Sequence, residues 1–218
     1  MESVLRIIAF GCSQTYGHCL EDAYVVDNTK WDKVTVAEQP SKLAYPQLIG
    51  NHFNCEVYNL SYPGASNRNM WYEITKFDFL PTDIVICTWT MTERTMILQK
   101  QRKHHLGIWP SASPLNRAYQ KFISLCNDKQ DLDLQTFLYI DHSHSQIISK
   151  TQRVLHYKQN TNHLLNPPAW FTVPIKNSLD SIVPYDEMDY ALDNQHYGVT
   201  SHQRFANQMI QDLTTAPN

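Results

Sequence analysis

The sequence predicts an α/β protein, a three-layer α/β/α sandwich around a mostly parallel sheet of roughly five strands. Strand-like and helix-like patterns alternate along the chain, as a parallel sheet requires. The first strand-like run, Val4 to Phe10, is apolar except for Arg6, which is typical of a strand covered on both faces. Ser13, Gly64 and Thr90 each follow one of the first three strands. Because parallel strands end at one edge of a sheet, these three residues are expected to converge there, where such folds bind ligands.

The first half of the chain carries the clearest elements. After the first strand, residues 18–41 show little periodicity and several acidic side chains, which predicts a long surface loop over the edge of the site. The pattern then predicts helix 42–53, strand 56–60, helix 66–77 and strand 83–88. The second helix has apolar residues at helical spacing, which indicates a face packed in the core: Met70, Trp71, Ile74 and Phe77.

The second half is less regular. Residues 91–157 are predicted to be a mostly helical insertion, broken around 107–114, with one long helix over 132–157. Weak strands are expected at 162–165 and 181–183, separated by Pro167-Pro168, which bars a regular element. A final helix over 201–213 has one apolar face, made by Phe205, Met209, Ile210 and Leu213. This helix is expected to pack on the sheet and hold the loop before it.

Composition favours one globular unit. The 218 residues are expected to form a single domain, 1–218, with the loop insertion at about 18–41 and the helical insertion at about 91–157. Hydrophobic residues make up 42% and charged residues 18%, which excludes a disordered chain and a coiled coil. The net charge of −3 and the lack of a long basic run give no electrostatic case for a nucleic-acid partner.

The sequence also indicates the cellular compartment in which the protein is expected. The start, MESVLRIIAF, lacks the positive region and the long apolar stretch of a secretory signal, and no run of about 20 apolar residues predicts membrane insertion. The five cysteines form no CxxC pair and are expected to be free thiols. The cytoplasm is therefore the default expectation, with a virion-associated protein as the alternative. No metal or other cofactor is expected, because the histidines lack the spacing of a zinc site.

Two short segments supply the parts of a nucleophilic site. Ser13 lies in a Gly-Cys-Ser turn just after the first strand, where a small nucleophile is lifted out of the sheet. Near the other end, Asp193 stands three residues before His196, so that a carboxylate can orient an imidazole base. A serine hydroxyl needs a base held in one tautomer by a third group. Ser13, His196 and Asp193 are therefore the candidate catalytic residues. His202, at the start of the last helix, is the less favoured alternative base.

These segments resemble three motif blocks of the SGNH hydrolases, also called GDSL-like esterases and lipases. Gly11-Cys12-Ser13 resembles the nucleophile block, Asn59 to Gly64 the second block, and Asp193 to His196 the Asp-x-x-His block. The resemblance implies a flavodoxin-like SGNH fold and an oxyanion hole with backbone donors at Ser13 and Gly64.

The third family block, Gly-x-Asn-Asp, is the departure. The corresponding strand end reads Thr88-Trp89-Thr90-Met91, with no asparagine to act as the side-chain oxyanion donor. Thr90 is the first candidate to donate a hydroxyl in its place. Asn67 is a second candidate and a possible substrate contact, but the interpretation that it caps or begins the next helix is favoured. Arg94 is a candidate contact for an anionic substrate group, and pairing with an acidic residue is the favoured alternative.

The resemblance implies a serine esterase that forms an acyl-enzyme on Ser13. The expected substrate is a small-molecule or carbohydrate ester, with carbohydrate O-acetyl groups or other short acyl esters as the leading class. Because the asparagine is missing, a non-catalytic binding or structural protein on the same scaffold, for example a virion or surface component, is the alternative function. Acyl transfer to an acceptor other than water uses the same residues and is a third reading. The sequence leaves the oligomeric state open.

Overall fold

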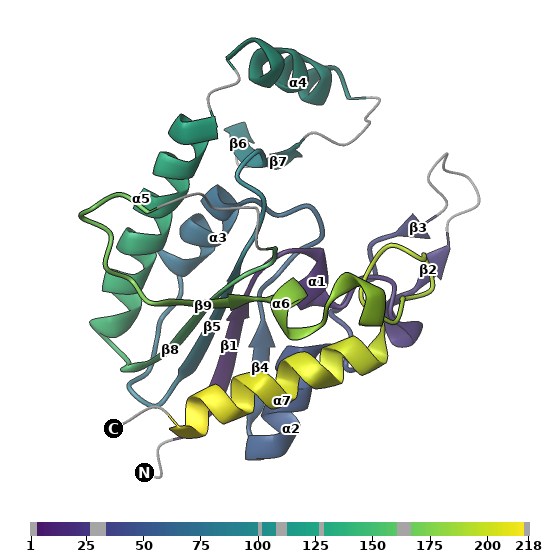
Figure 1. The fold of residues 1–218 in the computed structure, drawn as a ribbon, viewed down its shortest axis with the longest axis vertical. Helices are drawn as coiled ribbons and strands as arrows, with labels where there is room; N and C mark the ends of the chain where they lie inside the picture. Colours follow the sequence, from purple (N-terminus) through teal and green to yellow (C-terminus); the bar gives the residue numbers. More distant parts are fainter. Residues whose placement is uncertain are drawn as a thin grey trace.

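A computed structural model describes residues 4–26, 34–99, 102–107, 113–126, 129–160 and 167–215. Its centre is a five-stranded sheet of order β4-β1-β5-β8-β9, in which all neighbouring strands are parallel (Figure 1). The strands are β1 (Arg6–Phe10), β4 (Glu56–Asn59), β5 (Ile84–Trp89), β8 (Arg153–Lys158) and β9 (Ile175–Ser178). The predicted α/β/α class with a mostly parallel sheet of about five strands is confirmed.

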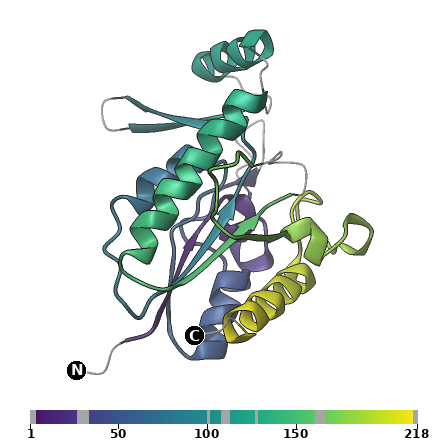
Figure 2. The same ribbon diagram turned by 60° about the vertical axis from the view of Figure 1, so that its left-hand side comes forward.

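Helices cover both faces of this sheet. On one face lie α2 (Tyr45–Phe53) and α7 (Val199–Thr215), and on the other lie α3 (Asn67–Ile74) and α5 (Lys129–Ile148) (Figures 1 and 2). Successive side chains of a strand point to opposite faces. Accordingly Ile7 packs toward α2 and α7, whereas its neighbour Ile8 packs toward α3 and α5. Two apolar cores result, one in each outer layer.

Smaller elements lie around the carboxyl ends of the strands. Helix α1 (Ser13–Tyr16) follows β1, and α6 (Leu179–Ile182) follows β9. Two antiparallel pairs, β2 (Val25–Val26) with β3 (Val34–Thr35) and β6 (Thr95–Gln99) with β7 (Arg102–Leu106), stand outside the main sheet. Helix α4 (Pro114–Cys126) lies near β6 and β7 at the top of Figure 1. In the described ranges, no helix combines the length and the apolar character needed to cross a bilayer.

The prediction of a mostly helical insertion over 91–157 is wrong in two places. Residues 95–106 contain β6 and β7, and the expected long helix 132–157 ends at Ile148, after which residues 153–158 form β8. Apolar runs of this length fit either a helix or a buried strand, so the local pattern does not decide between them. Pairing of β8 with β5, in which Leu155 lies opposite Ile86, makes the segment a strand.

One of the two weak strands was misplaced, and the other is not tested. The fourth strand of the sheet is β8, and the predicted strand at 162–165 falls outside the described residues. The last strand is β9 at 175–178, whereas residues 179–182 form the short helix α6. Within the expected loop at 18–41, the structure shows a 3-10 turn at 21–23 as well as β2 and β3.

Candidate active site

Ser13 is the first residue of α1, directly beyond the carboxyl end of β1. Gly11 permits this tight turn, because a Cβ there would lie only 1.9 Å from Oγ1 of Thr15. Ser13 is 6% exposed, and its Oγ lies 4.0 Å from Sγ of Cys12. Among the described residues, Ser13 Oγ makes no hydrogen bond to His196. Such bonds are often long in proteins without substrate and tighten on binding.

The Asp193 and His196 side chains form a close pair in the loop before α7. Nδ1 of His196 lies 2.6 Å from Oδ2 of Asp193, while Oδ1 of Asp193 accepts bonds from the backbone N–H groups of Gln195 at 3.0 Å and His196 at 3.1 Å. Asn194, with φ +57°, supplies the left-handed turn between them. The carboxylate thus binds both the imidazole ring and the backbone of its loop.

This hydrogen bonding determines the protonation of Asp193. Burial by itself raises the pKa of Asp193, but the bonds from His196 and from the backbone amides outweigh burial and hold this pKa well below its usual range. The carboxylate therefore stays ionised at neutral pH. Because it accepts the Nδ1 proton of His196, the neutral ring leaves Nε2 as a proton acceptor, which is the tautomer of a general base.

The loop with His196 is tied directly to the helix with Ser13. The backbone N–H of Tyr197 donates to Oε1 of Gln14 at 3.3 Å, so the residue next to His196 is hydrogen-bonded to the residue next to Ser13. The His18 ring also packs edge-on against the His196 ring, with centroids 5.2 Å apart. These contacts bring the two ends of the chain to the same sheet edge.

His202 occupies a different environment. It is fully buried at the start of α7, and its Nδ1 accepts the backbone N–H of Tyr45 at 3.2 Å. Burial lowers the pKa of His202 to about 3, so the ring is neutral in the fold. Its ring stacks on the Tyr45 ring, with centroids 5.8 Å apart. His202 therefore joins α7 to α2, whereas His196 carries the carboxylate partner.

Cys19 lies beside the same pair. Its Sγ, a carboxylate oxygen of Asp193 and a ring nitrogen of His196 all lie within 4.8 Å of one another. These are metal-ligand types, but Nδ1 of His196 is engaged by Asp193 at 2.6 Å. The donor set therefore suits a hydrogen-bonded pair better than a metal ion.

Two backbone amides are available at the carboxyl ends of β1 and β4. The N–H groups of Ser13 and Gly64 donate no hydrogen bond to any described residue. Gly64 has φ +80°, a conformation that favours glycine, and the space in front of its Cα is open for at least 4 Å. Asn59, at the end of β4, donates to the carbonyl of Thr15 at 2.8 Å and so links this strand to α1. Paired free N–H groups are the donors that an oxyanion hole uses.

The Thr90 side chain is already hydrogen-bonded. Thr90 is fully buried, and its hydroxyl donates to Oε1 of Gln159 at 2.8 Å and accepts from Nη1 of Arg94 at 3.2 Å. The carboxamide of Asn67 pairs with the Thr90 backbone, accepting its N–H at 2.8 Å and donating to its carbonyl at 3.0 Å. Asn67 also begins α3, while Ser66 caps that helix.

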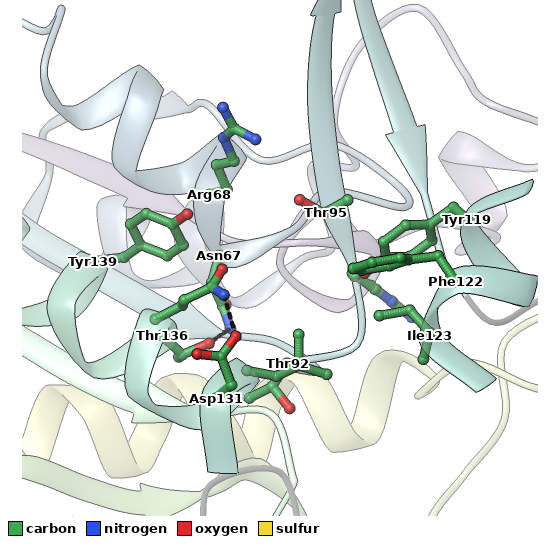
Figure 3. Close-up of a pocket in the computed structure, with 13 residues that line it drawn as sticks. Asn67, Arg68, Thr92, Thr95, Tyr119, Phe122, Ile123, Asp131, Thr136 and Tyr139 are labelled. Carbon is green, nitrogen blue, oxygen red and sulfur yellow. Dashed lines mark hydrogen bonds between the residues drawn. The ribbon is translucent and has the colours of Figure 1, made fainter. Parts of the chain in front are cut away.

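Asn67 and Arg94 line a cavity of about 210 Å³ (Figure 3). Its walls come from α3, α4, α5 and the segment from Thr92 to Thr95, and Ser13 and His196 are not among the lining residues. The walls mix cationic, aromatic and hydroxyl groups: Arg68, Arg94, Tyr119, Phe122, Tyr139, Thr92 and Thr95. Of the predicted site residues, Ser13, Gly64, Asp193 and His196 thus lie toward the sheet edge, and Asn67 and Arg94 face this cavity.

Gln159 was missed by the sequence analysis. It directly follows β8, and its Oε1 accepts from both Thr90 Oγ1 and Cys12 Sγ. A polar residue just after a buried strand is the signal that identified Thr90. That signal was hidden because residues 153–157 were assigned to the helix predicted over 132–157.

No protein-family model and no curated protein matches this sequence. Solved structures do match the fold. A member of the lipolytic protein G-D-S-L family from Veillonella parvula DSM 2008 is 13% identical, with 97% of this chain and 100% of that chain covered and a TM-score of 0.52. A carbohydrate esterase is 11% identical, with 98% and 69% covered and a TM-score of 0.51. The chain therefore has an SGNH hydrolase-like fold, the fold of the esterases and lipases that it is similar to.

Proposed function

We propose that the protein is a serine esterase that hydrolyses short acyl esters through an acyl-enzyme on Ser13. The observation that carries the proposal is the Asp193–His196 pair, with its 2.6 Å contact and ionised carboxylate, in a loop bonded to the helix that begins at Ser13. The free amides at Ser13 and Gly64 support it, because they offer donors for a developing oxyanion.

The reaction follows from these roles. Nε2 of His196 takes the proton from Ser13 Oγ as the oxygen attacks the ester carbonyl, and the negative charge that develops on the carbonyl oxygen is bound by the N–H groups of Ser13 and Gly64. His196 then returns the proton to the leaving alkoxide, which departs as the alcohol and leaves an acyl ester on Ser13. His196 takes a proton from a water molecule as the water attacks this ester, and then returns that proton to Ser13 Oγ as the bond to the acyl group breaks, which releases the acid and restores the Ser13 hydroxyl.

Carbohydrate O-acetyl esters are the leading substrate class within this proposal. The nearby cavity supports a polar partner, because Arg68, Arg94 and Tyr139 line it together with aromatic faces. Sugars bind to such mixtures of hydrogen-bonding and flat apolar groups. In this reading Arg94 contacts the part of the substrate that does not react, whereas Asn67, whose carboxamide is bonded to Thr90 and Thr136, forms part of the cavity wall.

A non-catalytic binding protein is the second candidate, and three observations favour it. Ser13 is only 6% exposed and lacks a hydrogen bond to His196, and no asparagine stands at the third block. One of the similar structures is a carbohydrate esterase whose active site is described as having divergent catalytic and non-catalytic binding functions. Transfer of the acyl group to an alcohol other than water uses the same residues as hydrolysis.

Steady-state hydrolysis of p-nitrophenyl acetate and of acetylated xylan, with and without added alcohol acceptors, tests the proposal. We expect turnover by the protein and a loss of about 10⁶-fold in kcat for Ser13→Ala. Ser143→Ala is the matched control, because Ser143 lies in α5 away from the sheet edge and is expected to leave kcat unchanged. Absence of turnover by folded protein that still binds acetylated xylan would support the binding protein instead.

A further inference from the structure

The Gln159 side chain lies at the sheet edge beside the position of the missing asparagine. β8 pairs with β5 in parallel, with Lys158 opposite Trp89, and the N–H of Gln159 continues the ladder by donating to the Trp89 carbonyl at 2.8 Å. Gln159 is therefore the neighbour of Thr90 across the strands. Thr90 itself stands at the third block, where the oxyanion asparagine is expected.

The carboxamide of Gln159 is held in one orientation. Its Oε1 accepts from Thr90 Oγ1 at 2.8 Å and from Cys12 Sγ at 3.0 Å. Arg94 donates to the same Thr90 hydroxyl at 3.2 Å and, having no acceptor, cannot take the Thr90 proton, which goes to Oε1 of Gln159. This network assigns the oxygen of the carboxamide to the Thr90 side and leaves the amide nitrogen on the other side.

That amide nitrogen is available. Nε2 of Gln159 makes no hydrogen bond to any described residue, and it is not among the buried polar atoms without a partner, so solvent reaches it. Its Oε1 contacts the thiol of Cys12, the residue next to the nucleophile, and Cys12 Sγ lies 4.0 Å from Ser13 Oγ. A free N–H₂ group thus belongs to the side chain whose oxygen contacts Cys12, the residue next to Ser13.

From these contacts we propose that Gln159 supplies the third donor of the oxyanion hole, through Nε2, in place of the missing asparagine. The group is the same carboxamide, one methylene longer, and it comes from the end of β8 instead of β5. Thr90 is then a positioning residue that acts through Gln159, because its hydroxyl bonds Oε1 and is not free for the substrate. This inference rests on the proposed esterase function and identifies one more group that acts in it.

Gln159→Glu is the sharpest variant. It keeps the length of the side chain and an oxygen facing Thr90 and Cys12, but replaces the N–H₂ donor with a second oxygen. We expect kcat to fall about 10²- to 10³-fold for Gln159→Glu and for Gln159→Ala, with KM changed less than about threefold. The affinity for an alkyl boronic acid, which forms a tetrahedral adduct with the serine, is expected to fall in parallel with kcat/KM. Gln152→Ala, an exposed glutamine before the same strand, is the control.

A double-mutant cycle with Thr90→Val separates the two possible donors. If Thr90 acts through Gln159, Thr90→Val lowers kcat in the wild-type background but has little further effect in Gln159→Ala. If Thr90 is itself the donor, Thr90→Val lowers kcat by the same factor in the Gln159→Ala background, and this result overturns the inference. The inference is also overturned if turnover is lost in Ser13→Ala but Gln159→Glu keeps a kcat within threefold of the wild type. That result would leave the proposed esterase function intact. Folded wild-type protein without turnover overturns both.

Discussion

Replacing Asp193 with asparagine is expected to prevent His196 from acting as a base while leaving its imidazole ring in place. Oδ2 of Asp193 accepts the Nδ1 proton of His196 at 2.6 Å, and Oδ1 accepts two backbone amides. In Asp193→Asn the oxygen of the new carboxamide can keep the two backbone bonds. The N–H₂ group of the asparagine then faces Nδ1 of His196, so that Nδ1 must accept a hydrogen bond instead of donating one. The ring proton moves to Nε2, so that this nitrogen can no longer take a proton from Ser13.

The expected loss follows from this tautomer change. An equivalent carboxylate-to-amide change in a serine triad lowers kcat about 10⁴-fold, which corresponds to about 5.4 kcal/mol of transition-state stabilisation. The pKa of Asp193 lies well below its usual range, so the carboxylate of the wild type stays charged across pH 5–9. We therefore expect the loss to persist over that whole range.

The assay is the kcat of p-nitrophenyl acetate hydrolysis between pH 5 and pH 9. Asp189→Asn is the matched control in the same part of the chain. Asp189 accepts the backbone N–H groups of Thr200 at 2.8 Å and Ser201 at 2.7 Å at the start of α7, so its neutralisation is expected to affect stability and leave kcat within about threefold. An Asp193→Asn enzyme within tenfold of the wild type would refute the reasoning, because His196 would then act as a base without its orienting carboxylate.

Three further predictions concern the stability of the scaffold and are measured by urea denaturation. The carboxylate of Asp83 is fully buried and accepts hydrogen bonds from Nε and Nη2 of the part-buried Arg6, each at 2.7 Å, so Asp83→Ala, which removes the charged partner of this guanidinium, is expected to lower the free energy of unfolding by about 1.5 to 3 kcal/mol. The Ser143 hydroxyl is buried in α5 without a hydrogen-bond partner among the described residues, so Ser143→Ala is expected to raise this free energy by about 1 kcal/mol. Burial lowers the pKa of His156 and of His202 to about 3, so the unfolded chain takes up protons first as the pH falls below about 6.5. Between about pH 6.5 and pH 3 each of these histidines is expected to cost up to about 1.4 kcal/mol of stability per pH unit, with no such dependence above pH 7.

Each of these three stability predictions has a result that would contradict it. Asp83→Ala with a loss under about 1 kcal/mol would mean that the ion pair is not buried in solution. A destabilised Ser143→Ala would mean that the hydroxyl has a partner that the fold does not show. Stability that is flat from pH 7 to pH 4 would mean that the two histidines are solvated or protonated in the folded state.

The sequence predicted the elements that local patterns specify. The apolar run of β1, the helical spacing of Met70 and Ile74 in α3, and the face of α7 with Phe205 all identify their elements without tertiary information. The nucleophile turn is equally local, because Gly11 is required by the close approach of Thr15.

The missed elements depend on contacts between distant residues. β8 continues the apolar character of α5 with Val154 and Leu155, and only its pairing with β5, in which Arg153 lies opposite Ile84, makes it a strand. The same dependence on distant contacts applies to the candidate site. Asp193 and His196 are close in sequence and were predictable as a pair, whereas Gln159 reaches the site only because β8 adjoins β5.

Reaction with a fluorophosphonate probe, followed by intact-mass and peptide analysis, tests the central claim that Ser13 is an activated nucleophile. The proposed site predicts one adduct per chain on Ser13, absent in Ser13→Ala and in His196→Ala and present in Ser143→Ala. Folded wild-type protein that stays unlabelled, or an adduct that persists in His196→Ala, would contradict the account, because neither is compatible with a serine activated by the Asp193–His196 pair.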